Sequence, residues 1–285
     1  MIRRSNRRSS TRSNLSRTKR TELTQAALKA VSASGAVLVR YFFGRAANSV
    51  QFKGRNDLVT AADLHSCRVI RDSLKSVYPN HDLLFEEGEF SELSGSRFRW
   101  IVDPLDGTTF HNRGLPFFST ILALEVQGFT ELGICCSPVS GDLFIAGRSQ
   151  GSEHWNRRLH IERRIRVSSV RKLEEAVIGF SYGKSAAHAQ QAATALSRLL
   201  PVCRSITRLG GAEIGYVASG ACEAFIDNSS TPWDFAAIAL LVREAGGKVT
   251  DFAGREWNCD SKSIVASNGL VHAAVLRLID FRSTE

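Results

Sequence analysis

The chain has 285 residues, of which 43% are hydrophobic and 23% charged, and its formal net charge is +9 at pH 7. This length allows one large or two modest domains, and no apolar run approaches the roughly 18 residues that span a membrane. Residues 1–20 contain seven arginines, one lysine and no acidic residue, so this segment carries nearly all of the net charge. The rest of the chain is nearly neutral and shows no general excess of basic residues.

Residues 1–20 are rich in arginine and serine. A secretory signal peptide needs an apolar stretch, which this segment lacks. We therefore expect residues 1–20 to form a disordered basic tail. Two other interpretations stay open: an arm that contacts RNA or anionic surfaces weakly, and an organellar presequence, which shares the arginine-rich and acid-poor composition.

Six cysteines are scattered along the chain, at positions 67, 135, 136, 203, 222 and 259. None forms a C-x-x-C pair, so the spacing indicates neither a zinc site nor a disulfide framework. Free cysteines are typical of a reducing compartment. We therefore expect a cytoplasmic protein.

Residues 21–148 are expected to form an N-terminal α+β half. Apolar residues recur at helical spacing from Thr21 and predict a helix that ends near Gly44. Asp63 is expected to cap a second helix that stops at Pro79. A turn is predicted at residues 127–128. Extended segments are predicted at residues 58–60, 83–85, 100–102, 117–126, 132–136 and 143–146.

Residues 149–285 are expected to form a C-terminal α/β half. The basic, turn-rich residues 147–166 suggest a seam between the two halves. The helix predicted at residues 231–247 is apolar nearly all round, which indicates a buried helix. The other predicted elements are strands at 176–180, 224–227, 248–251 and 263–266, a helix at 186–200, a short helix after residue 212, and a last helix near the end of the sequence.

Four carboxylates lie at the ends of predicted buried elements. Glu86 and Asp103 each end a strand, Asp106 follows Asp103 after a Pro-Leu bend, and Asp234 begins the apolar helix. A charge at the edge of a core is costly unless it is paired, hydrogen-bonded or bound to a metal. Each acid alone is explained by a helix cap or a surface salt bridge. The four together favour a site for Mg²⁺ or Mn²⁺, which prefer hard oxygen ligands, rather than zinc.

The motifs around these acids occur in a defined order: D-L-V-T-x-x-D at residues 57–63, E-E at 86–87, D-P-L-D-G-T-T at 103–109, W-D-x-A-A at 233–237 and E-A-G-G at 244–247. In this order and with these separations they resemble the inositol monophosphatase family, part of a wider superfamily of Mg²⁺-dependent, lithium-sensitive sugar phosphatases. The similarity runs from about Thr21 to the end of the sequence. It implies an α/β (α+β) fold, a layered αβαβα sandwich with the metal site between the two halves.

The resemblance implies a set of metal ligands. Glu86 and Asp103, with the backbone carbonyl of Leu105, correspond to the ligands of a first metal. Asp103, Asp106 and Asp234 correspond to those of a second metal, so that Asp103 would bridge the two. A third, looser metal would again use Glu86.

The resemblance also implies catalytic and phosphate-binding roles. Thr108 corresponds to the threonine that helps deprotonate the attacking water, and Asp63 to the acid that hydrogen-bonds its hydroxyl. The backbone amides of Gly107, Thr108 and Thr109 would hold phosphate oxygens. Lys53 corresponds to a basic residue near the metal site. His111 is interpreted as a loop residue with no catalytic part.

The substrate side of the resemblance is less complete. Gly210, Gly211 and Ala212 resemble a segment that contacts the sugar or inositol, and Asp227 lies where a carboxylate often binds a substrate hydroxyl. A salt bridge at a strand end would explain Asp227 equally well. The Phe-His pair at residues 110–111 departs from the Asn-aromatic pair usual in the family, so the loop that faces the substrate differs.

The implied activity is that of a Mg²⁺-dependent phosphomonoester hydrolase. Its substrate would be inositol-1-phosphate or a related sugar phosphate, its cofactor two or three Mg²⁺ ions with Mn²⁺ as a substitute, and its quaternary state a homodimer. Two cations about 4 Å apart offset the charge of the ester and acidify the attacking water. Fructose-1,6-bisphosphatase, histidinol-phosphatase and nucleotide phosphatase activities stay open, although D-G-T-T argues against the nucleotide 3′-phosphatase branch.

An alternative of another class is a module that binds RNA or a protein through the basic tail, with phosphatase activity secondary or lost. The four intact acids argue against lost activity.

Overall fold

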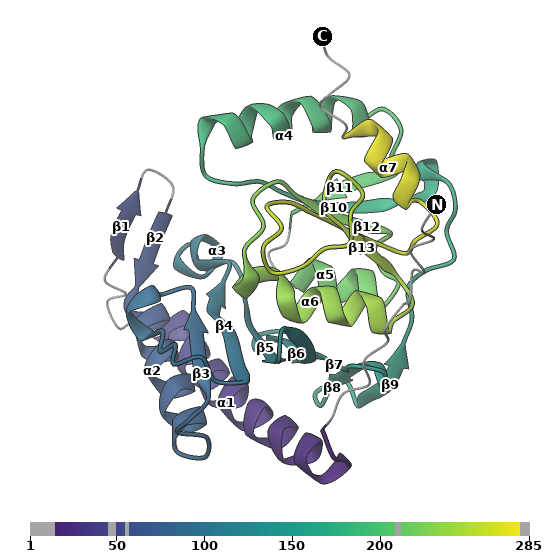
Figure 1. Ribbon diagram of the computed structural model, residues 1–285. Coiled ribbons are helices and arrows are strands. Elements are labelled where there is room, and N and C mark those ends of the chain that lie inside the picture. Colours follow the sequence, from purple (N-terminus) through teal and green to yellow (C-terminus); the bar gives the residue numbers. More distant parts are fainter. Residues whose placement is uncertain (1–14, 45–49, 55–56, 209–211, 280–285) are drawn as a thin grey trace, which may run out of the picture.

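The computed structural model describes residues 15–44, 50–54, 57–208 and 212–279, with side chains from residue 59 onward in the third range and from residue 215 onward in the last. Its elements stack in five layers (Figure 1). Two helices, a seven-stranded sheet, two further helices, a five-stranded sheet and a last pair of helices follow one another. This confirms the predicted αβαβα sandwich.

The first sheet has the strand order β3-β4-β5-β6-β7-β8-β9. Only the β3–β4 pair is parallel, and all other neighbours are antiparallel. The strands are β3 (Asp82–Phe85), β4 (Phe98–Asp106), β5 (Ser119–Val126), β6 (Phe129–Ser137), β7 (Asp142–Gly147), β8 (Gly151–Asn156) and β9 (Ile161–Ile165).

The second sheet has the order β11-β10-β12-β14-β13, in which β10, β11 and β12 run parallel. Its strands are β10 (Val177–Ser181), β11 (Ser205–Thr207), β12 (Ala224–Asp227), β13 (Lys248–Thr250) and β14 (Ile264–Ser267). A separate hairpin pairs β1 (Val50–Gly54) with β2 (Asp57–Thr60).

The helices form three layers that cover both faces of each sheet. α1 (Arg17–Phe43) and α2 (Ala61–Lys75) pack on the outer face of the first sheet, α5 (Ala212–Ala218) and α6 (Pro232–Glu244) lie between the sheets, and α4 (Ala186–Leu199) and α7 (His272–Leu278) cover the second sheet. The short helix α3 (Thr108–Asn112) follows β4, and single 3₁₀ turns occupy Gly88–Phe90 and Leu173–Glu175.

Helix α6 is buried on all sides, as its composition predicts. Eight consecutive residues, 235–242, are buried because both sheets contact the helix. Gly133 on β6 permits this approach, since a Cβ atom there would lie 2.5 Å from the carbonyl oxygen of Ala237. The first sheet and α6 are therefore held at a fixed separation.

The start of α1 differs from the prediction. The helix begins at Arg17 rather than at Thr21, so residues 17–20 belong to α1 and not to a disordered tail. The side chain of Ser16 accepts a hydrogen bond from the amide of Lys19, and Arg20 pairs with Glu131 on β6 at 3.3 Å. These contacts order a segment whose composition alone indicates disorder. The expectation for residues 1–14 lies outside the described residues.

The bounds of α2 also differ. The N-cap is Thr60, and Asp63 is the third residue of the helix, where its carboxylate accepts a hydrogen bond from the Thr60 amide. The helix ends at Lys75, before Pro79, and Val77, which follows it, is 54% exposed.

The predicted turn-rich seam at residues 147–166 is wrong in its secondary structure. Strands β8 and β9 extend the first sheet to Ile165. The three charged residues 162–164 are exposed on the edge strand, which explains why this stretch lacks the apolar pattern of a strand. The division of the chain at residue 148 stays a prediction, and the first sheet does not end there.

By length and composition α1 is apolar enough to cross a membrane. Its hydropathy has an explanation within the fold, because a face of mainly small and aliphatic residues packs against α2, β5 and β6. The expectation that the chain has no membrane segment stays a prediction.

Replacing Gly133 with alanine tests the contact between β6 and α6. The added Cβ would meet backbone atoms that cannot rotate away, and such overpacking costs about 1–3 kcal/mol. We expect the melting temperature of Gly133→Ala to fall by several degrees. Gly88→Ala is the matched control, since a Cβ at Gly88 meets nothing within 4 Å. Equal melting temperatures for the two variants would contradict the close contact.

Candidate active site

Two acids are brought together by the parallel pairing of β3 and β4. Phe85 pairs with Val102, and the amide of Glu86 donates a hydrogen bond to the carbonyl of Val102 at 3.1 Å. Glu86 therefore follows β3 at the level where Asp103 lies in β4. The Asp103 side chain is fully buried, with 1% of its surface exposed.

A bulge in β4 sets the position of Asp106. Asp103 is opposite Ile121 and Asp106 is opposite Ser119, so three residue steps on β4 face two on β5. In a regular strand, residues three apart point to opposite faces, and the extra residue removes this alternation. The Asp103 carboxylate accepts a hydrogen bond from the amide of Leu105 at 3.0 Å, which holds the bulge.

The fourth acid comes from the other half of the chain. Asp234 is in the first turn of α6, where the Thr231 hydroxyl donates to its carboxylate at 2.6 Å. Carboxylate oxygens of Asp103, Asp106 and Asp234 lie within 4.8 Å of one another. The structure thus brings together three acids from β4 and α6, and Glu86 is near enough for its charge to act on two of them.

The acids repel one another in the absence of cations. Burial and the charges of Glu86, Asp106 and Asp234 raise the pKa of Asp103 well above its ordinary value. Burial and the charge of Glu86 likewise raise the pKa of Asp234. A buried group of like charges is stable as carboxylates only with a compensating cation.

The donor set suits a hard divalent cation. All the convergent side chains offer carboxylate oxygens, and no His or Cys belongs to the cluster within the described residues. Mg²⁺ and Mn²⁺ prefer such ligands. The acids at 86, 103, 106 and 234, with the carbonyl of Leu105, are therefore chemically suited to the predicted metals.

A hydroxyl and a further acid lie beside this cluster. The Thr108 hydroxyl is 3.1 Å from Asp63 Oδ1 and 3.0 Å from the carbonyl oxygen of Leu105. The other oxygen of Asp63 accepts from the amide and the hydroxyl of Thr60, at 2.8 and 2.5 Å. Burial raises the pKa of Asp63, and these hydrogen bonds oppose the rise. Asp63 is thus fixed with one oxygen directed at Thr108.

The chain then turns into α3. Gly107 has φ +83°, and a Cβ there would lie 2.7 Å from the carbonyl oxygen of Phe117, so only glycine fits. The first amides of a helix have no acceptor within the helix. The amides of Thr108 and Thr109 at the start of α3 are therefore available for an anion, as predicted for a phosphate.

Residues 110–111 serve packing. His111 is buried, its Nε2 is 3.1 Å from the carbonyl oxygen of Leu38, and its ring packs edge-on against Phe118. Phe110 packs edge-on against Phe117. His111 thus lies in helix α3 rather than in a loop, and the expectation that it has no catalytic part stays a prediction.

The remaining substrate-side residues are described unevenly. Asp227 is buried at the end of β12 and accepts a hydrogen bond from the Ser229 amide at 2.5 Å. Burial raises its pKa. Lys53 lies on β1, but its side chain is outside the described part of the structure. Gly210 and Gly211 are also outside it, and Ala212 begins α5 without a described side chain.

The threonines that hold two of the acids are absent from the predicted site. Thr60 and Thr231 are the N-caps of α2 and α6, and each contacts the acid three residues later. The signal is the pattern T-x-x-D, a variant of the capping box, which occurs at residues 60–63 and 231–234.

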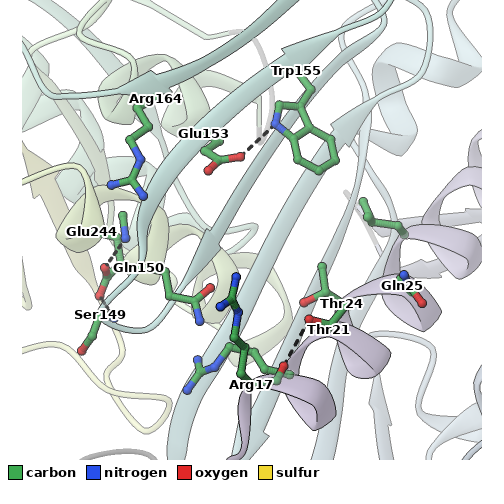
Figure 2. Close-up of a pocket in the computed structure, with 13 residues that line it drawn as sticks. Arg17, Thr21, Thr24, Gln25, Ser149, Gln150, Glu153, Trp155, Arg164 and Glu244 are labelled. Carbon is green, nitrogen blue, oxygen red and sulfur yellow. Dashed lines mark hydrogen bonds between the residues drawn. The ribbon is translucent and has the colours of Figure 1, made fainter.

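A large groove lies away from the acidic site. A groove of about 1060 Å³ is formed by the first turns of α1, the β7–β8 turn, β8, β9 and the end of α6, and none of the acids described above lines it (Figure 2). Its lining includes Arg17 and Arg20 of α1 and Arg164 of β9. The acidic site is defined by side-chain chemistry rather than by cavity size.

The chain is similar to known proteins over most of its length. The family model for the inositol monophosphatase family matches residues 19–283. Nus factor SuhB of Escherichia coli K12 is 34% identical over 254 residues, which span 88% of this chain and 92% of the relative. The fructose-1,6-bisphosphatase/inositol-1-monophosphatase of Thermotoga maritima is 34% identical over 245 residues, or 85% and 90% of the two chains.

Solved structures agree. The suppressor protein SuhB of Bartonella henselae superposes with a TM-score of 0.85 at 33% identity, covering 91% of this chain and 99% of that chain. The IMPase of Thermotoga maritima gives 0.82 at 31% identity, with 91% and 97% covered. The chain belongs to the inositol monophosphatase family.

Asp103→Asn tests the repulsion within the acid cluster. Removing one buried charge reduces the repulsion within the metal-free protein. A gain of about 1 kcal/mol in the free energy of unfolding raises the melting temperature by about 2–4 °C. We expect the metal-free variant to melt higher than the wild type and to lose the stabilisation that added Mg²⁺ gives. Thermal melts with and without Mg²⁺ measure both effects. Asp72→Asn, at an exposed acid on α2, is the control.

The same variant changes the pH dependence. Because the folded-state pKa of Asp103 is raised, the native state binds more protons than the unfolded chain between the two pKa values. Metal-free stability should therefore fall as pH rises from about 4 through the raised pKa. We expect a flatter profile for Asp103→Asn; identical profiles would contradict the charge cluster.

Proposed function

We propose that the protein is a Mg²⁺-dependent phosphomonoester hydrolase that acts on inositol-1-phosphate or a related sugar phosphate. Fructose-1,6-bisphosphatase and histidinol-phosphatase activities in the same site are the alternatives. The observation that carries the proposal is the convergence of Asp103, Asp106 and Asp234, with Glu86 nearby, beside a threonine–aspartate pair. The family and the Thermotoga relative's name support the same reaction class.

Different residues of the chain have different proposed roles. Glu86, Asp103, the Leu105 carbonyl, Asp106 and Asp234 would hold two or three Mg²⁺ ions, with Mn²⁺ as a substitute. When bound, such ions acidify water and offset the charge of a phosphate ester. The amides of Gly107 to Thr109 would orient the phosphate.

Thr108 is placed to move a proton. Its hydroxyl has one hydrogen, which it donates to Asp63 or to the Leu105 carbonyl, so its lone pairs are free to accept a hydrogen from the attacking water. A free hydroxyl is a poor base, and Asp63 makes the transfer effective. Water would then attack the phosphorus directly and lose its proton through Thr108 to Asp63, while the P–O bond to the alcohol breaks and the leaving alkoxide takes up a proton from solvent. No nucleophilic side chain is needed.

Thr108→Ala tests this relay. General acid–base steps contribute about 10²–10⁴-fold to the rate, so we expect kcat to fall at least about 100-fold. The Mg²⁺ concentration for half-maximal activity should change little, because the carboxylates are intact. Thr109→Ala is the matched control, since it keeps its amide and its exposed side chain contacts neither Asp63 nor Leu105. A small effect at Thr108 would reject the relay.

The substrate is tested directly. Purified protein would be assayed against inositol-1-phosphate, fructose-1,6-bisphosphate, histidinol phosphate and nucleotide phosphates, with Mg²⁺ and with or without lithium. Failure to hydrolyse any of them with Mg²⁺ or Mn²⁺ would reject the proposal.

We further propose a homodimer, as expected for the family, and a cytoplasmic location, in keeping with six free cysteines. Light scattering tests the first and fractionation the second.

A second role is favoured by the groove that Arg17, Arg20 and Arg164 line, which we call the arginine groove. Arg17 and Arg164 lie on α1 and β9 around the groove, and no ion pair within the described residues engages either of them (Figure 2). We propose that this groove, together with the basic residues 1–14, binds RNA weakly. Several relatives are named Nus factor SuhB, which is not an enzyme name.

The test is an Arg17→Glu/Arg164→Glu double variant. Each lost phosphate contact reduces the salt dependence of binding by about one unit of slope. Anisotropy of a labelled single-stranded RNA over a salt series should show weaker binding, with phosphatase turnover unchanged. Arg163→Glu is the control. In the β8–β9 register Arg163 lies opposite His154 and Arg164 lies opposite Glu153, so the side chains of these two consecutive arginines point to opposite faces of the sheet. A tail deletion should stop at residue 14, since Arg20 is part of the fold. Unchanged RNA binding in both the double variant and the tail deletion would reject this role.

A further inference from the structure

Three hydroxyls from different elements meet at the bulge of β4. The hydroxyl oxygen of Ser34 on α1 lies 2.6 Å from that of Ser66 on α2 and 2.7 Å from that of Thr120 on β5. Ser66 and Thr120 lie 3.2 and 3.0 Å from the carbonyl oxygen of Pro104. The three hydroxyls and this carbonyl therefore form a closed ring of hydrogen-bonding oxygens, the hydroxyl ring, which joins four elements of the fold.

The hydroxyl ring is shielded from water. Ser34, Ser66 and Thr120 are fully buried, and Pro104 is buried as well. Each hydroxyl carries one hydrogen, whereas a carbonyl oxygen has two lone pairs and only accepts. Ser66 and Thr120 can therefore both donate to Pro104, while Ser34 donates to one of them. Bulk water cannot replace a donor that is removed here, so the carbonyl would lose that bond outright.

The peptide group between Pro104 and Leu105 links the hydroxyl ring to the acid cluster. Its carbonyl oxygen accepts from the ring, and its N–H donates to Asp103 Oδ1 at 3.0 Å. A peptide group is planar, so hydrogen bonds at both ends fix its orientation. Hydrogen bonds in series also strengthen one another in a low-dielectric interior. The direction of the Asp103 carboxylate is thereby tied to the hydroxyls that bond to the opposite end of this peptide group.

Thr120 has a special place in the register of the sheet. It is the one residue of β5 between the positions opposite Asp103 and Asp106, so it faces the two bulged residues Pro104 and Leu105. A bulge disrupts the backbone ladder locally. Threonine and valine both suit a strand and have nearly the same shape. The strand itself therefore needs no hydroxyl at this position, whereas the bulge uses one.

We propose that Ser66 and Thr120 are positioning residues of the metal site. Through the peptide group after Pro104 they hold the Asp103 carboxylate in the orientation that binds divalent cations, and Ser34 orients the two hydroxyls from α1. This inference rests on the proposed Mg²⁺-dependent function and names residues outside the acid cluster that set its affinity for the metal.

The experiment measures metal binding without substrate. Mg²⁺ is titrated by calorimetry into the full-length chain after removal of metal, for the wild type and each variant. Loss of a hydrogen bond behind a metal ligand typically weakens binding about 10–100-fold. We expect the Mg²⁺ dissociation constant to rise at least about 10-fold in Ser66→Ala/Thr120→Val. It should rise less in Thr120→Val, where Ser66 still donates. Thr120→Ser, which keeps the hydroxyl, should bind Mg²⁺ as the wild type does.

Ser152→Ala is the matched control. Ser152 is also buried, and its hydroxyl donates to the carbonyl of Leu241 at 2.7 Å, in the last turns of α6 and away from Asp234. This variant loses a comparable hydrogen bond at a distance from the acids. Its melting temperature should fall, as for the hydroxyl-ring variants, while its Mg²⁺ dissociation constant stays that of the wild type. A purely structural role would lower the melting temperature in all of them without this difference in Mg²⁺ binding.

An unchanged Mg²⁺ dissociation constant in the double variant, or an equal rise in Ser152→Ala, would overturn the inference. If the double variant does not fold, the comparison of Thr120→Val with Thr120→Ser decides, and equal dissociation constants for these two would overturn it. A wild type that binds no Mg²⁺ would instead remove the proposed metal-dependent function, and this inference with it.

Discussion

The acid cluster is held together against the mutual repulsion of its carboxylates, and the packing of β4 and α6 has to withstand this repulsion. Asp103 and Asp106 are fixed by a bulge in β4, and Asp234 is fixed by the first turn of α6. None of them can withdraw, because α6 is packed between two sheets and approaches β6 to the limit that Gly133 allows. The metal-free fold thus carries an electrostatic penalty that a divalent cation would remove, and binding would be coupled to stability.

The same local device orients acids with different roles. Thr60 and Thr231 cap α2 and α6, and in each case the acid three residues later is held by the threonine. An acid in the first turn also interacts favourably with the helix dipole. In α2 this device directs one Asp63 oxygen at Thr108, whereas in α6 it directs Asp234 at the β4 acids. A short helix-start pattern therefore positions one acid of the proposed proton relay and one acid of the proposed metal site.

The parts of the fold that the sequence predicts are those with a strong local signal. The core strands and α6 are continuous apolar runs, and the D-P-L-D-G-T-T segment combines a strand end, a bend and a helix start. The predictions fail where tertiary contacts decide. Glu131 orders Arg20 at the start of α1, and pairing with β8 turns the charged residues 162–164 into a strand. The guanidinium carbon of Arg208 lies 4.7 Å from the centre of the Tyr182 ring, and this contact has no sequence signal, because β10 and β11 are joined through α4 and meet only in the sheet.

Helix α6 connects the two candidate functional regions. Asp234 lies in its first turn at the acid cluster, and Glu244 is its last residue, where the carboxylate accepts hydrogen bonds from the amides of Ser149 and Gly151 at 2.8 and 2.9 Å. These bonds shape the turn that lines the arginine groove. At 1.5 Å per residue, the helix separates the two ends by about 15 Å. A small phosphate ester and a polyanion would therefore use different surfaces, so that the two proposed roles do not compete for the same residues.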